Sequence, residues 1–188
     1  MNRRSAAVLV AALLLAGCAP ARPADTAAPT PTVSEAAIGG LDLVFLHAMV
    51  AHQERTLAIV RAAPERIQDR QLRTLVAAVE ATEADEVAQM RGWIRAAGPD
   101  QGHHQHDHPD PTGSPDPVSR LRTTPASGYD AVLVEILVPQ QRQAAELARA
   151  HLALAAAPAV RDLARRIDQS RTAEIQLVTA LPVGRTAS

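Results

Sequence analysis

The feature that most constrains this chain of 188 residues is an internal repeat that relates its two halves. A shift of 88 positions, which carries Asp42 onto Asp130, aligns the halves without a gap and keeps their apolar positions in register. The identical pairs include Asp42 with Asp130, Val50 with Val138, Gln53 with Gln141, Arg61 with Arg149, Arg73 with Arg161, Leu75 with Leu163 and Glu86 with Glu174. The sequence therefore predicts two copies of one structural unit.

Each copy has the pattern of a helical hairpin, at residues 41–97 and 129–182. Apolar residues recur at three- and four-residue spacing, which is typical of helices and not of strands. In the first copy Asp69 is placed to cap the second helix. In the second copy we expect a helix over 129–157, followed by another that begins at Pro158, a favourable first helical residue.

Four amphipathic helices predict an all-α fold, an antiparallel four-helix bundle in which each apolar face is buried against a partner. Only 2% of the residues are aromatic, so we expect a core of Leu, Val, Ile and Ala. A long connection, residues 98–128, joins the two hairpins, and residues 183–188 form a tail.

The first forty residues have the composition of a leader and a tether. Residues 1–17 combine a short basic stretch with an apolar run, which is typical of a signal peptide. They lead into Leu-Ala-Gly-Cys, which resembles the lipobox of bacterial lipoproteins and ends at Cys18. That resemblance implies cleavage before Cys18, lipidation of its thiol and attachment to the cell membrane on its extracytoplasmic side. The Pro- and Ala-rich residues 18–40 would then be a tether that buries no core.

Several classes of function are disfavoured by what the sequence lacks. Cys18 is the only cysteine, so lipidation would leave no thiol for disulfides, thiolate metal sites or catalysis. A net charge of −1 gives no electrostatic basis for binding nucleic acid. A ferritin-type di-iron centre needs Glu-x-x-His motifs, and no glutamate here has a histidine three residues later. We expect the protein not to be an enzyme.

A histidine-rich tract, residues 103–108 with the sequence HHQHDH, lies in the long connection. Imidazoles without thiolates suit Cu(II), Zn(II) or Ni(II). The tract is therefore a candidate metal site, and the alternative is an incidental solvated segment. Its candidate ligands are His103, His104, His106 and His108.

Polar residues also fall on the faces that the apolar pattern predicts to be buried. In the first helix, helical phasing places His52 inside, beside Met49 and Thr56, and His47 in water. These positions predict a polar layer inside the bundle, in which Glu86 is paired with His52. The other members of this layer are Glu83 in the first copy and Gln140, His151 and Glu174 in the second.

Two stretches, MVAHQERTLA and EADEVAQM, resemble the family known as domain of unknown function 305. Its pattern is Met-Ile-Pro-His-His-Gln followed by Gln-x-x-Glu-Ile-x-x-Met, and its members are secreted or lipid-anchored bacterial proteins. The resemblance implies a duplicated ferritin-like hairpin, and copper binding, which is associated with some members. The motif positions are Met49, His52, Glu86 and Met90 in the first copy, which would be metal ligands, and Pro139 and Glu174 in the second.

The motif histidines are only partly present. The first copy has His52-Gln53 where the family has two histidines, and the second has Gln140-Gln141. Glutamine is a poor ligand for copper or zinc. Two functions therefore remain open: a lipid-anchored protein that binds or buffers copper or zinc, or a structural or interaction module with an unknown protein partner, whose bundle has lost its metal site.

Overall fold

The computed structural model describes residues 37–98 and 116–183. All of these residues belong to one compact unit. The predicted leader, Cys18, most of the tether and the histidine tract 103–108 lie outside the described residues, so these predictions remain untested.

Over the described residues the structure contains five α-helices, two short 3₁₀ turns and no strand, which confirms the all-α prediction. The helices are α1 (Leu41–Ala62), α2 (Arg70–Ala97), α3 (Pro117–Thr123), α4 (Tyr129–His151) and α5 (Pro158–Ala180), and the 3₁₀ turns are Pro64–Arg66 and Ala126–Gly128. The Asp69 carboxylate caps α2 as predicted, because it accepts hydrogen bonds from the backbone N–H groups of Gln71 and Leu72.

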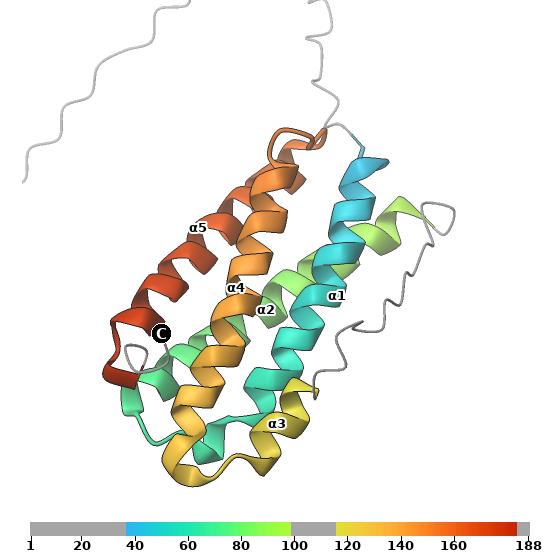
Figure 1. Cartoon of the computed structure of the whole chain (residues 1–188). Coiled ribbons are helices and arrows are strands. Elements are labelled where there is room, and N and C mark those ends of the chain that lie inside the picture. The colour runs from blue at the N-terminus through green and yellow to red at the C-terminus, as the bar shows by residue number, and fades with distance from the viewer. Residues whose placement is uncertain (1–36, 99–115, 184–188) are drawn as a thin grey trace, which may run out of the picture. The chain divides into compact units, whose positions relative to one another are not determined.

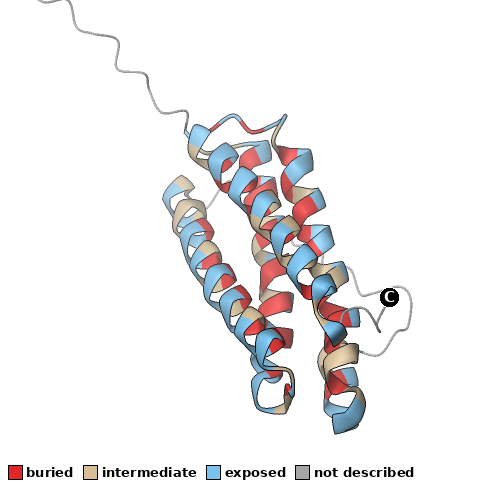
Figure 2. Cartoon of the chain, turned by 90° about the vertical axis from the view of Figure 1, so that its left-hand side faces the viewer, coloured by how far each residue is buried: buried red, intermediate tan, exposed pale blue. Residues whose placement is uncertain are grey.

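The four long helices form two hairpins that pack together through α1 and α4 (Figure 1). The buried face of each helix turns toward the others, and its exposed residues form the outer surface (Figure 2). Leu, Val, Ile and Ala supply most of the core, as the composition predicts, and Met49 and Met90 add to it. Contact between α2 and α5 is sparse, which leaves a groove between these helices.

The connection between the hairpins and the end of α4 differ from the sequence-based expectation. The region expected to be a loop, 98–128, contains α3, which starts after the capping residue Asp116 and buries Leu121. Helix α4 ends at His151 and not at residue 157. The His151 side chain is buried against Asp42 of α1, and the chain turns there toward α5.

The repeat is also visible in the contacts. Asp42 of the first hairpin accepts hydrogen bonds from the N–H groups of Ala156 and Ala157, just before α5. Asp130, the equivalent residue of the second hairpin, accepts hydrogen bonds from the N–H groups of Gln68 and Asp69, just before α2. Each hairpin therefore satisfies backbone donors at the helix start of the other, where such donors lack intrahelical partners.

A surface ion pair is repeated as well. Arg61 pairs with Glu80 at 3.1 Å, and the equivalent Arg149 pairs with Asp168 at 2.7 Å.

In the part of the chain that the structure describes, no helix combines the length and apolar character that crossing a membrane requires.

Candidate functional site

A buried arginine lies at the centre of the bundle's polar layer. The Arg171 side chain of α5 is 0% exposed and faces three carboxylates. Its Nη1 donates to Glu174 Oε1 at 3.0 Å, and its Nη2 donates to Glu86 Oε2. Its Nε lies 3.5 Å from Glu83 Oε1, an electrostatic contact longer than an ordinary hydrogen bond. A guanidinium with its donors in a fixed fork is well suited to hold several carboxylates at once.

Two glutamines complete this group. Gln53 of α1 donates from Nε2 to Glu86 Oε2 at 2.6 Å, and Gln141 of α4 donates from Nε2 to Glu83 Oε1 at 2.9 Å. All four long helices thus supply a side chain. We call the six residues the Arg171 cluster: Gln53, Glu83, Glu86, Gln141, Arg171 and Glu174.

The cluster contains three carboxyl groups and one guanidinium. Burial raises the pKa of Glu83 to about 7, against the opposing charge of Arg171 and the hydrogen bond from Gln141. Burial likewise raises the pKa of Glu86 and of Glu174, again opposed by Arg171. These three carboxyl groups therefore retain protons at pH values where exposed glutamates are ionised.

Several oxygens of the cluster have no hydrogen-bond partner within the protein. Gln53 and Gln141 donate through their amide nitrogens, and their amide oxygens have no partner. The carboxyl groups of Glu83 and Glu174 each have one oxygen without a partner. These atoms are Gln53 Oε1, Glu83 Oε2, Gln141 Oε1 and Glu174 Oε2. Buried acceptors of this kind require protons, water or a cation as partners.

The predicted pairing of Glu86 with His52 is wrong. His52 is buried as expected, but its Nε2 lies 3.0 Å from the backbone oxygen of Gln140, to which it donates. Burial lowers the pKa of His52, which keeps the imidazole neutral. Glu86 is instead held by Gln53 and Arg171. Helical phasing gave the correct face for both residues but could not show which side chains meet across the helices.

The copper ligands implied by the family resemblance do not fit the interior that is present. Met49 and Met90 are 0% exposed and belong to the hydrophobic core, His52 Nε2 is committed to a backbone oxygen, and Glu86 is bound to a guanidinium. Over residues 37–98 and 116–183, no group of three or more His, Cys, Asp or Glu side chains is arranged to hold a metal ion.

The remaining polar predictions have mixed outcomes. His47 is half-buried and not fully in water, whereas His151 is buried at the end of α4. His151 stacks on Phe45, with ring centroids 4.3 Å apart, and its Nε2 donates to Asp42 Oδ1 at 2.8 Å. Of the glutamine pair in α4, Gln141 is the buried member, and Gln140 uses its backbone oxygen to accept from His52.

The central role of Arg171 was not predicted, although the sequence contains a signal for it. Arg171 follows Ile167 by four residues and precedes Val178 by seven, so it lies on the apolar face of α5. An arginine on that face needs a buried counter-charge. Glu83 and Glu86, on the apolar face of α2, are the charges that satisfy it.

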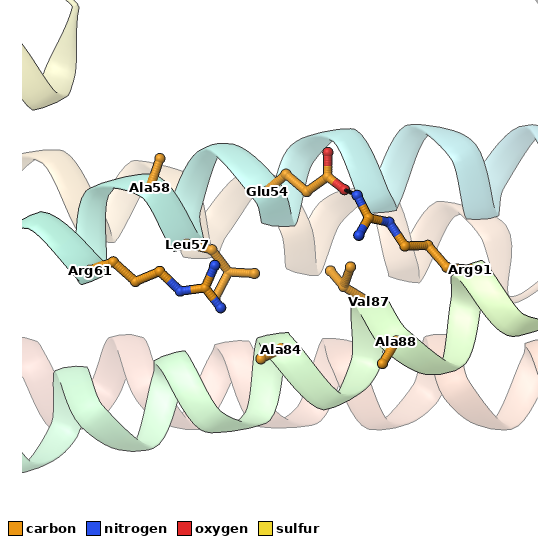
Figure 3. Close-up of a pocket in the computed structure, with 8 residues that line it drawn as sticks. All are labelled: Glu54, Leu57, Ala58, Arg61, Ala84, Val87, Ala88 and Arg91. Carbon is orange, nitrogen blue, oxygen red and sulfur yellow. Dashed lines mark hydrogen bonds and ion pairs between the residues drawn. The ribbon is translucent and has the colours of Figure 1, made fainter.

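A hollow between α1 and α2 offers less chemistry (Figure 3). Its floor is formed by small and apolar side chains, among them Leu57 and Val87. Of the arginines at its sides, Arg91 is paired with Glu54, and Arg61 is paired with Glu80. The charges at its edges are thus already neutralised by partners, and nothing in the hollow indicates a ligand.

In fold the protein is an all-α helical protein built of two related hairpins, which enclose a buried arginine–carboxylate cluster. The sequence profile described as "Domain of unknown function (DUF305)" matches residues 42–181. The chain belongs to this family.

A solved structure shows the same fold. A crystal structure of a DUF305 fragment from Deinococcus radiodurans is similar, with a TM-score of 0.64 and 22% sequence identity. The similarity covers 77% of this chain and 95% of that one. No curated protein sequence matches the chain.

Proposed function

We propose that this protein is a lipid-anchored, non-enzymatic component of the bacterial cell envelope. In this proposal an antiparallel, ferritin-like four-helix bundle is a structural support, and divalent metal, copper or zinc, is bound by the histidines of residues 103–108 and not by the bundle interior. The LAGC sequence ending at Cys18 supports the anchor, and the HHQHDH tract supports the metal site.

The observation that carries this division of roles is the position of Arg171. Its guanidinium occupies the space among Glu83, Glu86 and Glu174, and a metal ion bound there would lie next to a fixed positive charge. At about 4 Å, two unit charges repel by roughly 4 kcal/mol at the effective dielectric constant of partly buried sites. The interior is therefore better suited to fix the packing of the four helices than to take up a metal.

Outside the interior, imidazoles are the best available ligands for these metals. Four histidines within six residues, with Asp107 among them, suit Cu(II) and Zn(II), and these ligands bind only when neutral. Affinity should therefore fall as the pH drops through about 6.5.

The test is a calorimetric titration of Cu(II) and Zn(II) into the chain that begins at Ala19. Replacing the four histidines of 103–108 with alanine should remove most of the binding, and His52→Ala should change it little. Metal should raise the melting temperature of the wild type only slightly, because ligands outside the core bind folded and unfolded chains alike.

Two results would contradict the proposal. Binding that survives the four-histidine replacement but disappears in His52→Ala would return the metal to the interior. Absence of binding in the wild type would leave the structural or interaction module as the function, and that outcome is also the one in which a protein partner should be sought.

A further inference from the structure

The Arg171 cluster leaves four oxygens and one donor, Arg171 Nε, without a hydrogen-bond partner. Gln53, Glu83 and Gln141 are each at most 2% exposed, and each has an oxygen without a hydrogen-bond partner. Together with the bonded oxygens of Glu86 and Glu174, they surround Arg171 with carboxylate and amide oxygen. Such hard oxygen donors are the ligands that Mg²⁺ and Mn²⁺ prefer.

A guanidinium and a hydrated divalent cation have similar spatial requirements. A carboxylate oxygen hydrogen-bonded to a guanidinium lies roughly 4 Å from the central carbon. A carboxylate that contacts Mg²⁺ through a bound water lies at a similar distance, because the metal–water bond is about 2.1 Å and the hydrogen bond about 2.7 Å. The cluster is spaced for an ion that keeps its waters, although it lacks the closer arrangement needed for direct ligation by three side chains.

The cluster also has a route to solvent. The groove between α2 and α5 has a volume of about 760 Å³, and its lining includes Glu86. The Glu86 side chain is 12% exposed, whereas Arg171 and Glu83 behind it are 0% and 1% exposed. The other lining residues are all polar: Thr82, Asp85, Gln89, Arg166, Gln169 and Ser170. A hydrated cation could therefore reach the outer carboxylate of the cluster without crossing the hydrophobic core.

We propose that the Arg171 cluster is a site for a hydrated divalent cation of the Mg²⁺ class, and that the protein keeps it filled with its own Arg171 guanidinium. Because the guanidinium is part of the chain, it always occupies the site and excludes a metal ion from solution. Arg171 is then the residue that decides whether the bundle takes up metal. This inference rests on the part of the proposed function that assigns no metal to the interior of the wild type.

The test replaces Arg171 in a chain whose four histidines at 103–108 are already alanine, so that the tract cannot contribute. Mn²⁺ is the probe, and its binding is measured by electron paramagnetic resonance and calorimetry at about pH 8, where glutamates are ionised. Arg171→Gln should bind one Mn²⁺ per chain at least about tenfold more tightly than the parent chain. Its melting temperature should rise with Mn²⁺, whereas that of the parent should not.

Two matched variants complete the design. Arg171→Lys keeps a fixed positive charge and should not gain binding. Arg171→Gln combined with Glu83→Gln removes one carboxylate and should bind Mn²⁺ more weakly than Arg171→Gln alone. If Arg171→Gln is unfolded by itself, circular dichroism should show that Mn²⁺ restores its helices.

Three results would overturn the proposal: a folded Arg171→Gln that binds no more Mn²⁺ than the parent, an unfolded one that Mn²⁺ does not restore, or equal gains in Arg171→Lys and Arg171→Gln. Failure of the proposed function would appear differently, either as Cu(II) and Zn(II) binding that persists when only the histidines of 103–108 are changed, or as no binding of these metals by the wild type.

Discussion

The raised pKa of Glu83 makes the stability of the bundle depend on pH in a way that one substitution can isolate. In the folded chain Glu83 holds its proton up to about pH 7, whereas an exposed glutamate loses it near its usual pKa of 4.5. The folded state thus binds more protons than the unfolded state between these values, and stability falls as the pH rises through this range. The stability that the bound proton of Glu83 contributes is fully present below pH 4.5.

The magnitude follows from the size of the shift. Each tenfold difference in proton affinity is equivalent to about 1.4 kcal/mol. Between pH 5 and pH 8, Glu83 should therefore cost the folded state about 2–3 kcal/mol. Burial raises the pKa of Glu86 and Glu174, which adds to the loss. The lowered pKa of His52 acts in the opposite direction below pH 6.5, because its protonation favours the unfolded chain.

Glu83→Gln separates these contributions. The amide resembles the protonated carboxyl group, can still accept from Gln141 and does not titrate. Urea unfolding at pH 5 and pH 8 should show that the loss of stability between the two is about 2–3 kcal/mol smaller in the variant than in the wild type. Glu135→Gln, which alters an exposed pair with Arg120, is the control and should leave the difference unchanged. An equal loss in wild type and Glu83→Gln would refute the assignment of a proton to Glu83.

Two further predictions address the contacts between the hairpins and the proposed lipid anchor at Cys18. Asp42→Ala leaves buried backbone donors and His151 without their acceptor, so it should cost about 2–3 kcal/mol in urea unfolding. The equivalent Asp130→Ala, at a half-buried position, should cost only about 1 kcal/mol, and equal costs would show that burial does not set the difference. Cys18→Ser should prevent lipidation and release the protein from the membrane fraction, and unchanged retention would rule out Cys18 as the anchor.

The sequence predicted the helices well because helix formation here is encoded locally. The repeat and the apolar spacing placed all four long helices, and Asp69 caps α2 as its position indicated. The early end of α4 was missed because it depends on a tertiary contact, between His151 and Asp42 of α1. Helix α3 was missed because seven residues give too little periodicity to identify.

The polar layer was predicted as a layer but not as a set of partners. Glu83 and His52 were assigned to the interior correctly, whereas Glu86 lies at its edge, half-buried and lining the groove. Their partners depend on the distance and rotation between helices, which the periodicity of one helix does not contain. The family motif includes the position of His52, whereas Arg171 stands where the motif has glutamine, so the motif gives no indication of a buried arginine.

The exchange of helix-start contacts between Asp42 and Asp130 has an evolutionary consequence. Two-fold dimers form when the same surface of each subunit binds the other, so that every contact occurs twice. Here both copies of the contact lie within one chain, since each hairpin holds the start of the other's second helix. This is the pattern that duplication and fusion of a gene for a single hairpin would leave, if the product of that gene had formed a two-fold dimer. Separately produced chains 37–98 and 116–183 should then associate in solution, and two chains that stay monomeric would count against this history. Within one chain the two halves can diverge, and the equivalent positions Glu83 and Arg171 now carry opposite charges that face each other in the interior.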